Sequence, residues 1–131
     1  MLVEAGLTYV RVFADQHGRS CLEEQAIAFD RELSAPPAEP LKVASLLAAF
    51  GTPEDVMLVA GDTSWVGSEP HPAPARLLWA ILSGEWQVTV DDGITRSFTA
   101  GELVLFEDTT GSGHSSRLLS DGSLALVLRL T

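Results

Sequence analysis

Residues 76–106 read RLLWAILSGEWQVTVDDGITRSFTAGELVLF, and this stretch decides the fold class. Residues 76–82 are apolar at nearly every position, as in a strand that is covered on both faces. In residues 86–90 apolar and polar side chains alternate, which is the period of a strand with one buried face. Asp92-Gly93 is typical of a tight hairpin turn, because glycine adopts the positive φ that such turns need. Short strands separated by turns predict an all-β domain of the sandwich, barrel or jelly-roll type.

The same rhythm continues on both sides of this stretch. Further strands are predicted at residues 9–14, 25–29, 55–60, 118–119 and 124–130. We expect an irregular loop at 61–74, whereas 42–50 fits either a helix or a strand. Prolines in 35–40 exclude a helix and an interior strand, so this segment is predicted to be an extended surface connector. The length of 131 residues fits a single domain, 1–131, that contains the connector.

Charge and composition exclude several classes of function. The chain has 18 acidic and 8 basic residues and a formal net charge of −10, so nucleic acid is not an expected partner. The same charge disfavours an anionic membrane surface. No apolar run reaches the roughly 20 residues that span a bilayer, and the first residues do not resemble a signal peptide. We therefore expect a cytoplasmic protein with no membrane partner. Cys21, the single cysteine, excludes an intramolecular disulfide and is expected to be at least half-buried.

Residues 71–114 resemble a group of small single-domain cupins. The resemblance rests on His-Pro-Ala-Pro at 71–74, Leu-Ser-Gly at 82–84, Asp-Asp-Gly at 91–93, Thr-Ala-Gly-Glu at 99–102 and Asp-Thr-Thr-Gly-Ser-Gly-His at 108–114. It implies a cupin-type jelly-roll β-barrel, in a family whose small members often pair as homodimers. Cupins include oxygenases, isomerases, epimerases and plain binding modules, so the fold alone does not define a function.

In cupins, histidines and a glutamate from two motifs hold a divalent metal inside the barrel. The first histidine position falls on His71, but the second falls on Ala73, the glutamate position on Leu77 and the third histidine position on Val104. One imidazole does not hold a divalent ion against water, because mononuclear sites supply several protein ligands. The resemblance therefore implies a barrel without a metal or another cofactor.

Strand alternation indicates what lies in place of the metal site. If Leu77, at the glutamate position, faces the barrel interior, every second residue of its strand does too. The same holds for the strand of Val104, at the third histidine position. The interior is then lined by apolar side chains: Ala73, Leu77, Trp79, Ile81, Val104 and Phe106. Two alternatives stay open. The barrel is either a solid core or an open apolar pocket with few polar groups, which is the usual form of a small-molecule site.

Two histidines are the polar candidates for such a pocket. His71 either points inward, as the resemblance implies, or caps a backbone carbonyl at the end of a loop. His114 follows a glycine-rich segment and is expected at the start of a strand. An unperturbed pKa of about 6.5 lets an imidazole act as general acid or base. Trp65, in the 61–74 loop, is a candidate lid. Glu102 and Glu107 are expected on the surface.

These features predict a metal-independent cupin that binds a small, mainly apolar organic molecule. The leading hypothesis is an isomerase or cyclase of secondary metabolism, acting on a polyketide-like or other apolar substrate, with His71 and His114 as catalytic residues. One alternative is a non-catalytic ligand-binding or dimeric interaction module. Another is a metal-dependent oxygenase with a rearranged site of His71, His114 and a carboxylate such as Asp108. Asp108 itself is otherwise expected in a turn, bonded to its own backbone.

Overall fold

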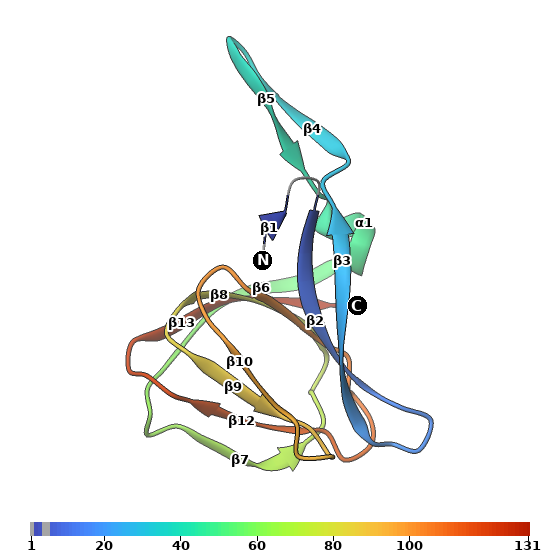
Figure 1. Cartoon of the computed structure of the whole chain (residues 1–131), viewed down its shortest axis with the longest axis vertical. Helices are drawn as coiled ribbons and strands as arrows, with labels where there is room; N and C mark the ends of the chain where they lie inside the picture. The colour runs from blue at the N-terminus through green and yellow to red at the C-terminus, as the bar shows by residue number, and fades with distance from the viewer. Residues whose placement is uncertain (1, 4–5) are drawn as a thin grey trace.

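The computed structural model describes residues 2–3 and 6–131, and it confirms the prediction of an all-β fold (Figure 1). The elements in chain order are β1 (Leu2–Val3), β2 (Gly6–Ala14), β3 (Ser20–Ala28), β4 (Arg31–Ala35), β5 (Ala38–Val43), α1 (Leu46–Phe50), β6 (Pro53–Gly61), β7 (Val66–His71), β8 (Arg76–Ser83), β9 (Trp86–Thr89), β10 (Thr95–Phe98), β11 (Leu103–Phe106), β12 (His114–Leu118) and β13 (Ser123–Leu130).

Two sheets form the body of the molecule. The larger has the order β1-β2-β11-β8-β13-β6, with β3 added beside β2, and the smaller has the order β10-β9-β12-β7. The main core combines inward-facing residues of both sheets, such as Val12 and Ile81 from the larger and Val88 and Phe98 from the smaller. The sheets therefore face each other and enclose the space between them (Figure 1).

Strand β8 is apolar on both faces, and both faces are covered over most of its length. On one face Ile81 belongs to the main core between the sheets, and Leu77 and Trp79 pack against that core. On the opposite face Leu78 packs in a second cluster with Phe50 of α1. The segment 42–50, which fitted either a helix or a strand, thus forms both: β5 ends at Val43 and α1 follows. Ser45 caps α1, since its side chain accepts a hydrogen bond of 3.2 Å from the backbone N–H of Ala48.

The predicted connector at 35–40 is on the surface, but it is not an unpaired segment. It is the tip of a hairpin in which β4 pairs with β5 across Pro36-Pro37, whose peptide bond is cis. The hairpin projects from the body as an arm (Figure 1). Pro40 lies within β5, which is possible because a two-stranded sheet consists of edge strands only and has free edges where no N–H is needed.

The predicted loop at 61–74 was wrong over part of its length. Residues 66–71 form β7, an edge strand that pairs antiparallel with β12. Its glycine and proline content gives no strand signal, and the hydrogen bonds come from a partner far along the chain. Strand β12 begins at His114, as expected for this histidine, rather than at residue 118.

The outer face of the larger sheet carries exposed apolar side chains on two strands, Val56 and Leu58 of β6 and Leu82 of β8. The homodimer implied by the cupin resemblance stays a prediction. Among the described residues, no helix has both the length and the apolar character needed to cross a membrane.

Candidate functional site

A cavity of about 250 Å³ lies between the two sheets. Strands of both sheets contribute to its mainly apolar wall. All the residues that the sequence assigned to the site line it: Trp65, His71, Ala73, Leu77, Trp79, Ile81, Val104, Phe106 and His114. Of the two alternatives for the interior, the structure therefore has the open pocket and not the solid core.

The apolar wall follows from strand register. Antiparallel pairing of β8 with β11 places Leu77 opposite Phe106 and Trp79 opposite Val104. Residues opposite each other in a ladder share a face, and alternation repeats this face every second position. Leu77 and Val104 therefore lie on the same face of the sheet, diagonal to each other in this ladder, and both carry hydrocarbon side chains.

Aromatic rings continue this wall as a connected row toward the histidines. Successive ring centroids are 5.2 Å apart for Trp86 and Trp79, 6.1 Å for Trp79 and Phe106, 4.5 Å for Phe106 and His114, and 5.2 Å for His114 and His71. The Phe106 and His114 rings are stacked, with an interplanar angle of 28°. The imidazole of His114 therefore has one face on hydrocarbon while it borders the cavity.

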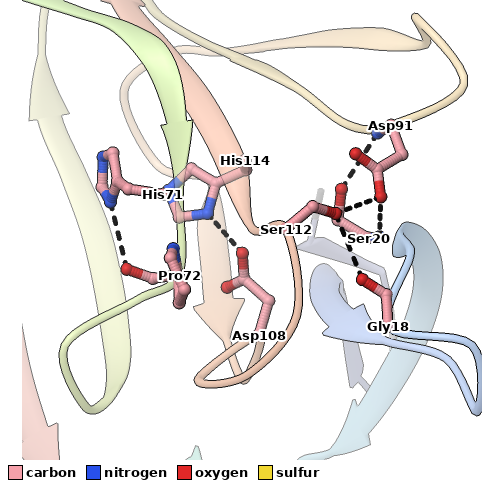
Figure 2. A network of polar contacts seen from close by, with 8 residues as sticks. All are labelled: Gly18, Ser20, His71, Pro72, Asp91, Asp108, Ser112 and His114. Carbon is pink, nitrogen blue, oxygen red and sulfur yellow. Dashed lines mark hydrogen bonds and ion pairs between the residues drawn. The ribbon is translucent and has the colours of Figure 1, made fainter.

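His114 forms a buried pair with Asp108 (Figure 2). Nδ1 of His114 lies 2.5 Å from Oδ2 of Asp108, and the two residues are 5% and 0% exposed. With Asp108 ionised, its carboxylate accepts a hydrogen bond from Nδ1–H, so in the neutral imidazole the lone pair is on Nε2. The other carboxylate oxygen, Oδ1, is buried without a partner among the described residues. The prediction that Asp108 bonds its own backbone was therefore wrong, because this carboxylate turns inward to the histidine.

The loop between Asp108 and His114 is held at several points. The backbone N–H of Ala73 donates to the carbonyl of Asp108 over 2.9 Å. Gly113 has a φ of 75°, and its Cα faces the His71 carbonyl so closely that a Cβ atom would clash with it. This position therefore needs glycine on both counts. The loop geometry keeps the carboxylate and the imidazole within reach of each other.

A second set of contacts anchors the loop on its other side (Figure 2). The Ser112 hydroxyl bonds to the Gly18 carbonyl over 3.1 Å and also to the Asp91 carboxylate, which accepts a further bond from the Ser20 N–H. The bonds from Ser112 and Ser20 lower the pKa of Asp91 below its usual 3.8. Asp91 thus stays ionised at neutral pH and ties the loop to the β2–β3 turn.

His71 combines both roles that the sequence left open. Its ring lines the cavity, and its Nδ1 also lies 3.1 Å from the carbonyl oxygen of Pro72 (Figure 2). The residue is exposed, unlike His114. His71 therefore lies at the rim of the cavity, with His114 farther inside.

The two tryptophans of the wall differ in their polar atoms. Nε1 of Trp86 donates to the carbonyl of Ser83 over 3.2 Å. Nε1 of Trp79 is buried and finds no acceptor among the described residues. An unpaired buried donor costs free energy, so the N–H of Trp79 is an uncompensated cost of the folded state. Sequence reasoning placed Trp79 in the wall but gave no signal for this difference.

Trp65 lies at the edge of the cavity with 47% of its surface exposed. Its ring packs against Gly67, where a Cβ atom would collide with it. The turn that precedes it is anchored, since both the N–H and the hydroxyl of Thr63 bond to Asp121 over 3.1 Å. This arrangement fits the candidate lid, with a fixed base and an exposed ring.

The two glutamates near the site are less exposed than the sequence predicted. Glu102 is half-buried and accepts a bond of 2.7 Å from the Thr99 N–H. Glu107 lies 2.5 Å from Nε of Arg11 and 2.9 Å from Nε of Arg76. Burial would raise the pKa of Glu107, but the bonds from the two arginines outweigh it and the net shift is downward. Glu107 holds β2, β8 and β11 together on the side of the sheet away from the cavity.

The residues present do not favour the rearranged metal site. In the part of the chain that the structure describes, no group of three or more histidine, cysteine, aspartate or glutamate side chains could hold a metal ion. His114 and Asp108 bond to each other, and the Nδ1 of His71 faces a carbonyl oxygen. No family model matches the sequence, and no curated protein matches it either.

Proposed function

We propose that this chain is a metal-independent cupin that binds a small, mainly apolar organic molecule and moves a proton on it, as an isomerase or cyclase does. The observation that carries the proposal is the pairing of an apolar cavity of about 250 Å³ with a buried His114–Asp108 pair in its wall. Hydrocarbon side chains recognise the ligand's shape, and the imidazole supplies the proton chemistry.

Two features support the cupin part of the proposal. The glycines at the motif positions, Gly84, Gly93 and Gly101, have φ values of 81°, 82° and 91°, so each lies where a residue with a side chain is disfavoured. His71, at the retained motif position, and Ala73, Leu77 and Val104, at the three replaced positions, all line the cavity between the two facing sheets. Both features are expected of a barrel that keeps the cupin framework and has lost its metal ligands.

The size of the cavity limits the ligand. A dry apolar cavity of about 150 Å³ holds benzene, so by proportion 250 Å³ holds about ten non-hydrogen atoms. This corresponds to a fused bicycle or a short branched chain. A polyketide-like molecule of greater length would extend past Trp65 at the edge of the cavity.

The catalytic part of the proposal rests on the contact between His114 and Asp108. A buried carboxylate with an unpaired oxygen costs stability, so packing alone does not explain why Asp108 is present. An imidazole that this carboxylate orients through Nδ1 can act as a general base through Nε2. His71, at the rim, is placed to pass the proton between the site and solvent.

Thermal unfolding in the presence of apolar compounds of eight to twelve carbons tests the binding proposal. We expect a rise in the unfolding midpoint that saturates with ligand concentration, since a ligand bound only by the folded state stabilises it. No rise with any such compound would overturn the proposal. Binding without chemical change of any bound compound would support the alternative of a non-catalytic ligand-binding module.

A further inference from the structure

We propose that two copies of this chain form a symmetric dimer in which the arm of each copy lies on the outer face of the other copy's larger sheet. The arm is the hairpin of residues 31–43, which contains β4 and β5. Both surfaces carry exposed apolar side chains in the single chain. This dimer goes beyond the proposed function and does not depend on it.

The arm is an amphipathic ribbon. Leu33 lies opposite Leu41 in its register, so the two side chains share one face, and they are 54% and 59% exposed. The other face is polar, and there Nζ of Lys42 lies 3.1 Å from Oε2 of Glu32. Among the described residues β4 and β5 pair only with each other. A two-stranded hairpin is marginally stable by itself in water, so its apolar face needs a surface on which to pack.

The outer face of β6 and β13 offers such a surface. It consists of three aliphatic cross-strand pairs, which are Val56–Leu128, Leu58–Leu126 and Ala60–Leu124. Residues opposite each other in a ladder share a face, so the three pairs form one patch that no charged side chain interrupts. Leu58, on the edge strand of the sheet, is 67% exposed. An uncovered apolar patch of this kind is typical of a site of protein association.

The chain itself covers the neighbouring part of the same outer face. Phe50 of α1 packs in the second cluster with Leu78, and Leu128 packs against this cluster. Helix α1 follows the arm directly, since β5 ends at Val43 and α1 begins at Leu46. The arm therefore leaves the body beside this face, and it projects away from the body (Figure 1). Its own apolar face cannot cover the patch of the same chain in this position.

The dimensions of the two surfaces agree. A strand rises about 3.3 Å per residue, so the five residues of β4 span about 17 Å. Neighbouring strands lie about 4.8 Å apart, so β8, β13 and β6 together are about 10–15 Å wide. An arm laid across these three strands therefore reaches from one side of the exposed patch to the other.

Charge favours the arm as the element that meets a second copy. The chain has a formal net charge of −10, so two copies repel each other. Residues 31–43 contain two acidic and two basic side chains, and the arm thus carries no net charge while the rest of the chain carries all of it. A neutral arm on an uncharged patch is a contact that avoids most of this repulsion.

Two-fold symmetry gives the contact an adequate size. Each copy provides thirteen arm residues, eleven of them exposed, together with the six residues of the patch. Leu46 and Leu47, next to the base of the arm, are also exposed. A standard interface uses about 20–30 residues a side. A single arm on a single patch falls short of this number, whereas a symmetric pair, in which each copy gives its arm and receives the other's, reaches it.

Sedimentation velocity of the full chain tests the dimer. We expect the wild type to sediment as a dimer at about 100 μM, and Leu33→Glu and Leu58→Glu each to weaken association at least about 100-fold, because each buries an unpaired carboxylate. Ile94→Glu is the matched control. Ile94 is 54% exposed, as Leu33 is, but it lies between β9 and β10, so the dimer should remain. Circular dichroism of each variant shows that it is folded.

Cross-linking tests which surfaces meet. In a Cys21→Ser background, one preparation carries Leu33→Cys and the other carries Leu58→Cys. After subunit exchange, a short bismaleimide should join copies of the two preparations, and Leu58→Cys copies should not join each other. Joining of Leu58→Cys copies to each other would overturn the proposal in favour of two sheets packed face to face.

Three further results would also overturn it. They are a monomeric wild type at about 100 μM, a dimer that survives either Leu33→Glu or Leu58→Glu, and an equal loss of association in Ile94→Glu. A monomeric wild type would leave the patch to a partner other than a second copy. None of these results affects ligand binding in the cavity, so the proposed function would stand.

Discussion

Nδ1 of His114 lies 2.5 Å from Oδ2 of Asp108, and the carboxylate it meets is completely buried. The pair is formed across a glycine-containing loop whose other contacts reach Gly18 and Asp91. In a mainly apolar cavity wall, such a pair supplies a ring that can take part in proton transfer. Its consequences can be tested one side chain at a time.

Asp108→Asn should slow proton transfer far more than it weakens ligand binding. The amide oxygen can still accept a hydrogen bond from Nδ1–H, but the negative charge that stabilises the imidazolium is gone. We expect kcat for isomerisation of an apolar substrate to fall about 100-fold and KM to change less than about threefold. Nitrogen-15 NMR of labelled histidine should show Nε2 unprotonated in the wild type and a mixed tautomer population in Asp108→Leu. Equal losses in kcat and in binding would contradict the positioning role.

Ala73→Leu should block the ligand without unfolding the protein. Ala73 is 4% exposed and lines the cavity, so the added atoms enter existing space and the cost in unfolding free energy should stay below about 1 kcal/mol. We expect the affinity for a ten-carbon ligand to fall at least about tenfold, measured by equilibrium dialysis. Ala80→Leu, on the opposite face of β8, is the control and should leave the affinity unchanged. Undiminished binding in Ala73→Leu would place the ligand elsewhere.

Trp65→Ala should speed ligand release. The side chain is 47% exposed, so its loss should change the free energy of unfolding by only about 0.5 kcal/mol. Its ring covers the edge of the cavity, and a lid acts on exchange with solvent. We expect the dissociation rate constant, followed by stopped-flow displacement with a fluorescent apolar ligand, to rise about tenfold. A dissociation rate equal to that of the wild type would show that Trp65 is not a lid.

Introducing the ligand set of cupins at the positions that the resemblance indicates should create a metal site. Ala73→His, Leu77→Glu and Val104→His together with the native His71 would place four ligands around one cavity. We expect the triple variant to bind one Zn²⁺ or Ni²⁺ by isothermal titration calorimetry, with binding lost when His71 is also replaced by Ala. A folded triple variant that takes up no metal would argue against the proposal that this chain is a cupin.

Glu107→Gln should lower the free energy of unfolding by about 2 kcal/mol at neutral pH, because two arginines lose their shared carboxylate. The folded-state pKa of Glu107 is below its usual 4.5, so its contribution is full above that value and is lost as the pH falls through the folded-state pKa. Urea unfolding should therefore show that the difference in free energy of unfolding between the wild type and Glu107→Gln becomes smaller at acid pH. Glu54→Gln, which loses an exposed 4.0 Å pair with Arg129, should cost about 0.5 kcal/mol or less. A difference that does not change with pH would contradict a stabilising role for the ionised Glu107 carboxylate.

Much of the cavity wall could be predicted from sequence because strand alternation is a local property. Once Leu77 is assigned to the inner face, Trp79 and Ile81 must share that face, whatever lies opposite. The same reasoning gave Val104 and Phe106, and these residues do line one cavity. The turns at Asp92-Gly93 and before His114 could likewise be predicted from local sequence. A positive φ favours glycine at one position, and glycine is present at these positions.

Tertiary structure alone decided the polar part of the site. Asp108 carries no sequence signal for burial, and only the path of the loop turns it inward to His114 instead of toward solvent. Glu107 pairs with Arg11, which lies 96 positions away in the chain. The indole nitrogen of Trp86 reaches a carbonyl oxygen, whereas that of Trp79 does not. Alternation fixes which face a side chain takes. Charge pairs and hydrogen bonds depend on distances of a few ångströms between segments far apart in the chain, and these are set only when the sheets pack.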